Sequence, residues 1–256
     1  GPLNVPRSPQ GRPVLVQAGS SEGGKALGSR YADAIFTTQT TLEDGQQFYQ
    51  EMKDRAARWG RNPQYLKIMP GLSTVIGSTE AEAHARFDEL NAWHGEHGLL
   101  EQVAGRIGIP AKELDPDAPL PWDRIGAVAD FERGSQGFLE AQLNLARREN
   151  LSIRQLSRRI LVGHRLLVGT PEQVADTLSH WYLAHAADGF NIMPDMFPSG
   201  VEIFVDEVVP LLQQRGLFRR AYTGSTLREH LGLPFPDNQY ALRAWACRRS
   251  SLKRDS

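Results

Sequence analysis

Short apolar runs alternate with amphipathic helical patterns along most of this chain, and this alternation limits the possible folds. The apolar runs cover residues 13–18, 32–38, 65–77 and 189–194, and a helical pattern follows each of them. Strands that alternate with helices favour a parallel sheet whose faces are covered by those helices. The sequence therefore predicts an α/β fold with three β-α units, an insertion, one more helix and a last β-α unit. Four strands would form about half of an eight-stranded barrel.

Two threonines are predicted to start helices. Thr79 is followed three residues later by Glu82, and Thr170 is followed by Gln173, which is the spacing of a capping box. In this motif the threonine hydroxyl and the acidic or amide side chain each accept a hydrogen bond from a backbone N–H group at the helix start. Both positions are therefore expected to be helix N-caps.

Prolines predict two irregularities. Pro70 and Gly71 lie inside the run 65–77 and predict a break or bulge, because proline has no N–H group to donate to the strand ladder. Pro210 lies inside the last strong helical pattern, residues 201–216, and predicts a kink or break in that helix.

Residues 98–168 interrupt the alternation. This part contains the proline-rich stretch "IPAKELDPDAPLPWD", which has no clear period, and then helical patterns near residues 137–148 and 152–162. We therefore expect a helical insertion between the late strands. Residues 237–256 are polar and basic without apolar periodicity, and we expect this tail to be disordered. The predicted organisation is a partial barrel over residues 1–236 followed by the tail.

The composition narrows the classes of function. The net charge is −1, so nothing indicates binding to nucleic acid or to an anionic membrane surface. No apolar run reaches the roughly 18 residues that indicate a membrane-spanning helix. The single cysteine, Cys247, excludes an internal disulfide and favours a reducing compartment, so we expect a cytoplasmic protein. This isolated cysteine does not indicate a metal site.

The stretch "QAGSSEGGK", residues 17–25, lies between the first apolar run and a helical pattern. Residues 19–23 match G-x-S-x-G, the nucleophile elbow of hydrolases, in which Ser21 would attack the substrate. That chemistry also needs an acid and a histidine downstream, and no histidine of the sequence is clearly placed for it. A shifted frame resembles a P-loop up to Lys25, but the motif then needs Ser or Thr, and Ala26 follows.

A third interpretation of the same turn needs no nucleophile. A turn of small residues at a helix N-terminus exposes backbone N–H groups, which bind phosphate together with the helix dipole. The hydroxyls of Ser20 and Ser21 would add hydrogen-bond donors to such a site. The alternative is that these serines only cap the helix, and the pattern by itself does not choose between capping and phosphate binding.

Several stretches taken together resemble the bacterial-luciferase-like flavin monooxygenases. They are "PVLVQAGSSEGG", "ADAIFTT", "VGTPEQVADTL", "DGFNIMPDMFPSGVEIFVDEVVPLLQQRG" and "TLREHLGL", which span nearly the whole chain up to about residue 236. More narrowly, the chain resembles the subgroup that contains nitrilotriacetate monooxygenase, dibenzothiophene-sulfone monooxygenase and pristinamycin synthase. The resemblance implies the C-terminal portion of a (β/α)8 TIM barrel with a helical insertion between late strands.

The resemblance also implies a two-component oxygenation. The oxygenase component uses O2 and reduced FMN, which a separate NAD(P)H-dependent flavin reductase supplies, to oxygenate a small organic substrate. Homodimers are common in this family. Two alternatives stay open beside this interpretation: a truncated homologue that is catalytically inactive or serves as a partner protein, and a serine hydrolase that uses Ser21.

The resemblance places the FMN phosphate on the turn after the first strand. The candidate cofactor-binding residues are Gln17, Ala18, Gly19, Ser20 and Ser21. The candidates for the flavin-ring or substrate pocket are Phe36 and Asn191. Each of these candidates has a purely structural alternative. Gln17 and Ala18 would then pack in the sheet, Phe36 would be a plain core residue, and Asn191 would belong to a turn. No catalytic residue and no metal ligand is assigned.

Overall fold

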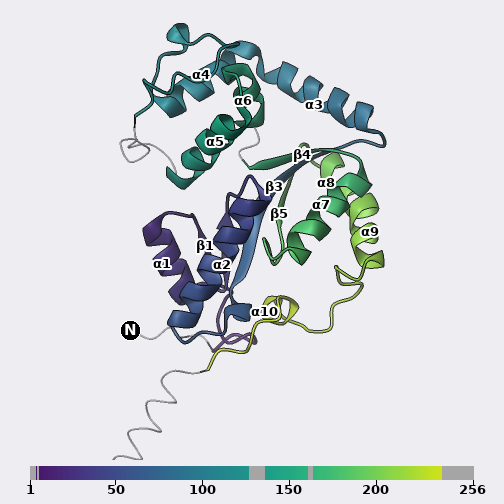
Figure 1. Ribbon diagram of the computed structural model, residues 1–256. Coiled ribbons are helices and arrows are strands. Elements are labelled where there is room, and N and C mark those ends of the chain that lie inside the picture. The colour runs from purple at the N-terminus through teal and green to yellow at the C-terminus, as the bar shows by residue number, and fades with distance from the viewer. Residues whose placement is uncertain (1–3, 5, 127–135, 161–163, 238–256) are drawn as a thin grey trace, which may run out of the picture. The chain divides into compact units, whose positions relative to one another are not determined.

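The structure of this protein is a computed structural model, and Figure 1 shows its arrangement of helices and strands. It describes residues 4, 6–126, 136–160 and 164–237 of the 256 residues. The chain divides into a larger unit, Leu15–Arg220, and a smaller unit formed by Gly1–Val14 and Ala221–Ser256. Cys247 and the predicted disordered tail from residue 238 onward lie outside the described residues.

The larger unit contains a parallel sheet, as the alternation predicted. Its five described strands are β1 (Val16–Ala18), β2 (Ala34–Thr37), β3 (Lys67–Ile76), β4 (Arg165–Gly169) and β5 (Asn191–Pro194). Strands β1, β2, β3 and β4 pair in that order, and β5 pairs with β3; every pairing is parallel. The prediction of an α/β fold with a parallel sheet is therefore confirmed.

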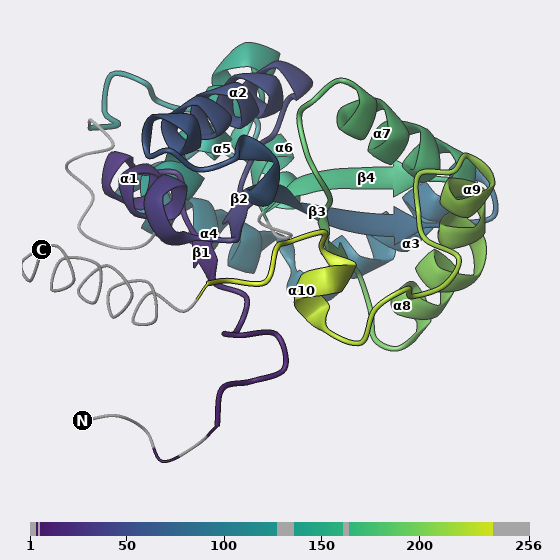
Figure 2. The same ribbon diagram turned by 90° about the horizontal axis from the view of Figure 1, so that it is seen from below.

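Helices cover one face of this sheet. They are α1 (Glu22–Tyr31), α2 (Leu42–Arg58), α3 (Glu80–His94), α7 (Pro171–Leu183), α8 (Ser199–Ile203) and α9 (Val209–Gln214). Strand positions Ile35 and Ile68 are buried in one core cluster with α2, and Leu72 is buried in a second cluster with α7 and α9. Figure 2 shows α7, α8 and α9 beside β3 and β4.

The opposite face of the sheet is less covered. Side chains of a strand alternate between its two faces, so Phe36 and Met69 point away from the face that carries Ile35 and Ile68. Phe36 and Met69 are only half-buried, and Val16 on β1 is 65% exposed. We call this the inner face, since a barrel would enclose it.

Strand β3 continues through the expected break. The register pairs Thr37 of β2 with Pro70, whereas β5 pairs with β3 from Gly71 and β4 pairs with it from Leu72. The prediction of a break or bulge at Pro70 and Gly71 was wrong, because these residues mark the exchange of partner strands rather than an interruption. Strand β4 was not predicted either, since most of its residues lie in the stretch assigned to the insertion.

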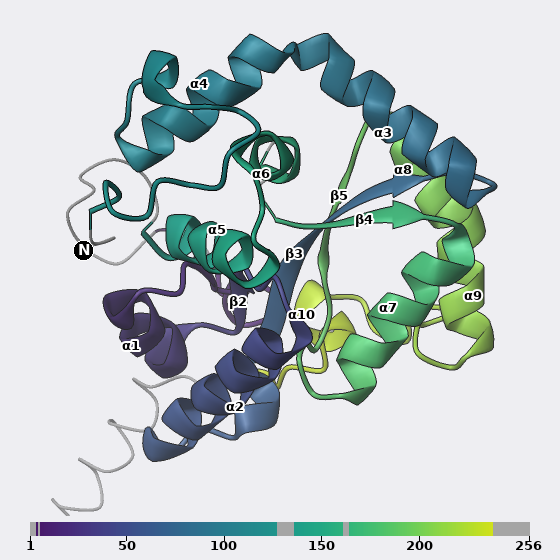
Figure 3. The same cartoon turned by 45° about the horizontal axis from the view of Figure 1, so that its top comes forward.

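The insertion consists of helices with a core of their own. These are α4 (Glu96–Ile107), the 3-10 helix η2 (Ala111–Glu113), α5 (Gln136–Glu149) and α6 (Ile153–Ile160). Buried apolar residues from all four helices form one cluster, separate from the two clusters on the sheet. Figure 3 shows α4, α5 and α6 as one group. The bounds of the insertion, residues 98–168, stay a prediction.

One arginine joins the insertion to the start of α2. The Arg148 guanidinium on α5 donates to both carboxylate oxygens of Asp44, each at 2.7 Å, and to the Thr41 hydroxyl. Thr41 is the N-cap of α2, which follows the carboxyl end of β2. The insertion therefore contacts the carboxyl end of the sheet, where the strand–helix turns lie.

The predicted capping boxes differ in detail. At α7 the full box forms, with Thr170 and Gln173 each accepting a backbone N–H group. At α3 the Thr79 hydroxyl accepts the Glu82 N–H, but the Glu82 carboxylate accepts from the backbone and hydroxyl of Ser78 instead. Both helices nevertheless begin where the sequence predicted.

The irregularity expected at Pro210 is present. The π-helical segment η4 (Phe204–Val208) separates α8 from α9, and Pro210 lies in the first turn of α9. Because proline has no N–H group to donate to the preceding turn, a wider turn in front of it relieves the lost hydrogen bond. The chain stays helical through this segment rather than breaking.

A buried lysine fixes the amino end of β3. Lys53 on α2 donates to the Leu66 carbonyl at 2.6 Å and to the Pro63 carbonyl at 3.1 Å, at the ends of the 3-10 helix η1 (Pro63–Tyr65). It also pairs with the Asp188 carboxylate at 2.8 Å. These bonds hold α2, η1 and the segment before β5 together.

The smaller unit contains the short helix α10 (Leu227–His230). Thr226 and Glu229 form a capping box at its start. Arg228 is buried and donates from its guanidinium to the Pro13 carbonyl, while its backbone N–H group donates to Gln10. The two segments of this unit are therefore joined by hydrogen bonds.

Candidate functional site

The turn between β1 and α1 depends on a glycine. Gly19 has φ +117°, a backbone conformation that residues with a Cβ rarely adopt. Its N–H group donates to the Phe36 carbonyl at 3.1 Å, so the turn is fixed to the neighbouring strand β2. The sequence Gly-Ser-Ser therefore forms a tight turn at the carboxyl end of β1.

Ser21 caps α1, as one of the sequence interpretations required. Its Oγ accepts the Gly24 N–H group at 3.3 Å, and its carbonyl accepts the Lys25 N–H group at 2.8 Å. The N–H groups of Glu22 and Gly23 have no acceptor within the helix, as at any helix start. A Cβ atom on Gly23 would meet no atom within 4 Å, so the space beside this first turn is open.

Ser20 lies in a polar cavity of about 260 Å³. The cavity is lined by Lys25 of α1, by the segment from Thr38 to Thr40 after β2, by the first turns of α2 and by α5 of the insertion. The Lys25 ammonium lies 2.8 Å from the Glu51 carboxylate, and Glu51 also accepts from Arg55 at 2.7 Å. These two cations hold the pKa of Glu51 below its usual value against the effect of its partial burial.

Gln17 faces the helix layer. Its Nε2 donates to the Ala18 carbonyl at 2.6 Å, and a Cβ atom on Gly28 of α1 would lie 2.9 Å from its Oε1. The register pairs Gln17 with Ile35, which faces α2, and pairs Ala18 with Phe36 on the inner face. Of these two candidates, Ala18 is therefore the one on the inner face; a cofactor contact for either residue stays a prediction.

Phe36 lies beside a histidine that was not among the predicted site residues. The rings of Phe36 and His164 have centroids 4.9 Å apart and are tilted by 31°. The Nδ1 atom of His164 lies 3.2 Å from the Thr38 hydroxyl. Burial lowers the pKa of His164. His164 directly precedes β4, and recognition of that strand would have been the signal that places this histidine near the sheet.

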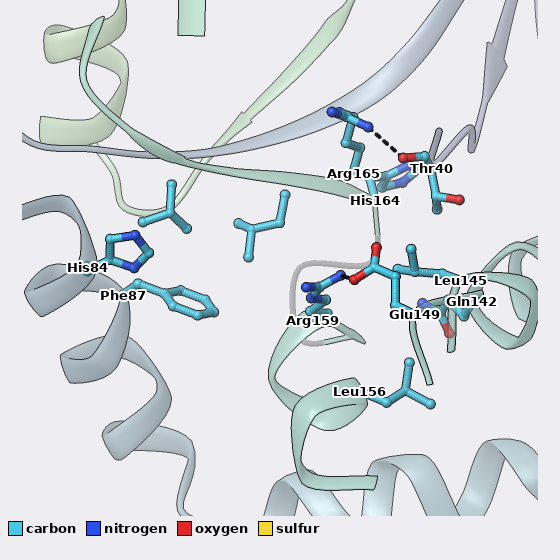
Figure 4. A pocket seen from close by; sticks show the side chains of 12 residues that line it. Thr40, His84, Phe87, Gln142, Leu145, Glu149, Leu156, Arg159, His164 and Arg165 are labelled. Atoms are coloured by element: carbon cyan, nitrogen blue, oxygen red, sulfur yellow. Dashed lines mark hydrogen bonds and ion pairs between the residues drawn. The ribbon is translucent and has the colours of Figure 1, made fainter. Parts of the chain in front are cut away.

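A second cavity, of about 370 Å³, lies between β4, α3 and the insertion helices α5 and α6. Figure 4 shows His164 beside Thr40 at one end of it and His84 with Phe87 at another. Its apolar lining residues are Phe87, Leu145, Leu156, Leu166 and Val168. Arg159 and Glu149 form an ion pair at 2.6 Å in its wall. Thr40 lines both cavities, so the two are neighbours on the carboxyl side of β2.

The last strand supplies structural contacts. Asn191 begins β5 and donates from its amide to the Met69 carbonyl of β3 at 3.0 Å. Asp195 directly follows β5, its side chain is almost fully buried, and it accepts two hydrogen bonds from Arg86 of α3. The structure therefore gives the Asn191 amide a partner on β3, and its role in a flavin or substrate pocket stays a prediction.

The described part of the chain contains neither a metal-binding cluster nor a membrane-spanning helix. Within these residues no group of three or more His, Cys, Asp or Glu side chains is arranged to hold a metal ion. Among the helices that the structure describes, none has the length and hydrophobicity of a membrane span.

The fold and the turn lead to a family. A family model described as luciferase-like monooxygenase matches residues 1–188, so the chain belongs to the luciferase-like monooxygenase family. Nitrilotriacetate monooxygenase component A of Aminobacter aminovorans is 49% identical over 246 residues, which are 94% of this chain and 53% of that protein. The family predicted from the sequence is confirmed, and the monooxygenase interpretation is favoured over the serine hydrolase that would use Ser21.

Solved structures agree with this assignment. EDTA monooxygenase from Chelativorans sp. BNC1 superimposes with a TM-score of 0.69 at 40% identity, covering 91% of this chain and 54% of that one. A riboflavin lyase, solved with modified FMN and riboflavin, superimposes with a TM-score of 0.71 at 29% identity, covering 91% and 50%. The chain thus has the α/β fold of the luciferase-like TIM barrels and spans about half the length of the relatives it matches.

Proposed function

We propose that this chain is part of the oxygenase component of a two-component, reduced-FMN-dependent monooxygenase. The observation that carries the proposal is the combination of family membership with an open, glycine-fixed turn at the carboxyl end of β1. Catalytic and ligand sites of parallel barrels lie at that end of their strands. The relatives are named as monooxygenases of nitrilotriacetate and EDTA, and a third relative was solved with modified FMN.

The residues of the turn fit a phosphate group. Ser20 and Ser21 offer hydroxyl groups, the first turn of α1 offers the N–H groups of Glu22 and Gly23, and the space beside Gly23 is open. Hydrogen bonds to a charged phosphate are worth roughly 1.5–3 kcal/mol each. FMN, when bound, supplies the oxygen chemistry, while the protein orients it and excludes water.

The remaining parts of the proposal concern partners. The reduced FMN would come from a separate NAD(P)H-dependent flavin reductase, and the protein would act as a homodimer. The small organic substrate would enter the cavity of about 370 Å³ between the sheet and the insertion, because this cavity adjoins the turn through Thr40 and has a partly apolar lining.

A comparison of two flavins tests the phosphate site. FMN and riboflavin differ by the phosphate, so titration of the purified protein with each, followed by flavin fluorescence, isolates the contribution of the turn. We expect the double variant Ser20→Ala/Ser21→Ala to weaken FMN binding by at least about 100-fold, for two lost charge-assisted hydrogen bonds. Riboflavin binding should change little.

The control is Thr170→Ala, which removes the N-cap of α7 in the same way but lies at a different helix. It should cost about 1 kcal/mol of stability without any change in FMN affinity. A protein that binds FMN no more tightly than riboflavin would contradict the proposal.

A further inference from the structure

Two methionines lie on the inner face of the sheet. Ile68 of β3 packs in a core cluster with α2, so Met69, the next residue, points to the opposite face. In the same way Ile192 of β5 packs against the cluster with α7 and α9, so Met193 points to the inner face. Both methionines are half-buried, and their thioethers lie on the side of the sheet that a barrel would enclose.

The two side chains border one group of inner-face residues. Met69 is the register partner of Phe36, whose ring contacts the His164 ring at 4.9 Å. A Cβ atom built on Gly71 of β3 would lie 2.8 Å from the Met193 methyl group and would clash with the His164 imidazole. Met193 and His164 therefore meet over the same glycine, and Met69 lies next to the other ring of the pair.

The other two of the four methionines differ in position. Met52 on α2 is 0% exposed and belongs to the core cluster on the helix side of the sheet. Met196 lies in the turn after β5 and is half-buried, as the inner-face methionines are. Burial therefore separates only Met52 from the inner-face pair, whereas Met196 differs from that pair by its place outside the strands.

A thioether can accept the oxygen atom that a monooxygenase transfers. Oxidation of methionine to the sulfoxide adds one oxygen to sulfur and turns an apolar side chain into a polar one. Reduced FMN would supply two electrons and two protons, and O2 would supply the oxygen. The O–O bond breaks, one oxygen atom forms the S–O bond, and the other leaves as water. Reduced FMN, O2 and thioether thus give oxidised FMN, sulfoxide and water.

We propose that Met69 and Met193 accept this oxygen atom when no organic substrate is bound, so that the protein oxidises its own inner face. This inference rests on the proposed function, which supplies reduced FMN and O2. Methionine sulfoxide reductases reverse such a modification, so the two thioethers form a reversible oxidation site.

Tandem mass spectrometry tests this, because it assigns added oxygen to individual methionines. The purified protein is mixed with chemically reduced FMN in aerated buffer, without substrate and with catalase to remove free hydrogen peroxide. Met69 and Met193 should each gain one oxygen atom, whereas Met52 and Met196 should stay unmodified. Reduced riboflavin at the same concentration should cause less oxidation, because it lacks the phosphate that the turn after β1 would bind.

A matched pair of variants locates the acceptors. Met193→Leu removes one thioether but keeps an apolar side chain of similar size, so it should end oxidation at this position and leave Met69 oxidised. Met196→Leu makes the same change in the turn after β5 and should leave the oxidation of both inner-face methionines unchanged.

Hydrogen peroxide added without flavin measures the accessibility of each thioether. It should oxidise Met196 as readily as Met69 and Met193, because all three are half-buried. If peroxide alone gave the same selectivity as reduced FMN, the pattern would reflect accessibility and the inference would be overturned.

The outcomes separate this inference from the proposed function. If FMN binds more tightly than riboflavin but catalase abolishes oxidation of Met69 and Met193, the inference is overturned and the proposed function stands. If FMN binds no more tightly than riboflavin, the proposed function fails and the inference falls with it. Oxidation of the pair in the presence of catalase, without oxidation of Met196, supports transfer of oxygen within the protein.

Discussion

The turns that follow β1 and β5 occupy equivalent places at the carboxyl ends of two parallel strands, yet they are built in opposite ways. After β1, small residues leave hydroxyl and N–H groups beside open space. After β5, the Asp195 side chain is 1% exposed and is fully engaged with Arg86, which also donates to Ser199 at 3.3 Å. Topology alone therefore does not make a ligand site. The proposed phosphate site differs from the turn after β5 in that open space lies beside its first helical turn, whereas the Asp195 carboxylate is already paired within the protein.

The largest expected effect comes from breaking the turn after β5, which we call the closed turn. Arg86→Ala leaves the buried Asp195 carboxylate without its cation, and such a loss costs about 3 kcal/mol of the free energy of unfolding. Urea unfolding followed by circular dichroism measures this change. FMN affinity should stay the same, because this turn is not part of the proposed phosphate site.

The matched control for this variant is Arg154→Ala. Arg154 also forms an ion pair with an aspartate, Asp117, whose side chain is 73% exposed. Exposed pairs contribute about 0–1 kcal/mol, so the control should lose far less stability. Equal losses in the two variants would show that the buried pair does not fix the turn after β5.

The next largest effect is expected at the turn after β1, which we call the open turn. Ser21→Asp keeps the N-cap, because Asp and Ser are equally good at this position, but it places a negative charge where the phosphate would bind. Stability should stay within about 0.5 kcal/mol, whereas FMN affinity should fall about 100-fold through a lost hydrogen bond and like-charge repulsion. Thermal unfolding and fluorescence titration of the same samples separate these two quantities.

Thr79→Asp introduces the same charge at the N-cap of α3 and serves as the control. It should change neither stability nor FMN affinity appreciably. An unchanged FMN affinity in Ser21→Asp would mean that this turn, however open, is only a helix start.

A smaller effect should reveal that the open turn is not optimised for stability. Gly23→Ala adds a methyl group into empty space within α1, so it should raise the free energy of unfolding by about 0.5 kcal/mol. Gly28→Ala in the same helix should instead destabilise the protein, because its Cβ would lie 2.9 Å from Gln17 and 3.0 Å from Ile35. Chemical unfolding of both variants tests this; a destabilising Gly23→Ala would show that the space beside the turn is not free.

The sequence was informative where a signal is local and limited where it is not. The turn at residues 19–21, the N-caps Thr79 and Thr170 and the irregularity at Pro210 depend on neighbouring residues, and the structure has the turn, both caps and the irregularity. The closed turn could not be predicted, because its meaning depends on Arg86, which lies 109 residues away from Asp195.

The contact between the rings of Phe36 and His164 shows the same limit more sharply. Thr38 and His164 are 126 residues apart in sequence, and the insertion lies between them. No periodicity in the sequence indicates that β4 returns to β3, since β4 has five residues, begins with a polar Arg165 and follows a helical segment. Strand exchange along β3 brings these residues together, and the same exchange explains why the break expected at Pro70 and Gly71 is absent.

The smallest effect concerns the protonation of His164. Burial lowers its pKa in the folded protein below the ordinary value of 6.5, so the unfolded chain binds this proton more readily. The folded state should therefore lose stability as the pH falls below about 6.5, and no contribution should exist well above that pH. His164→Gln cannot titrate, so its free energy of unfolding should decline less between about pH 7.5 and 5 than that of the unaltered protein. Urea unfolding across this pH range measures the difference, and an equal or steeper decline in the variant would mean that the imidazole of His164 is not held in a desolvated position.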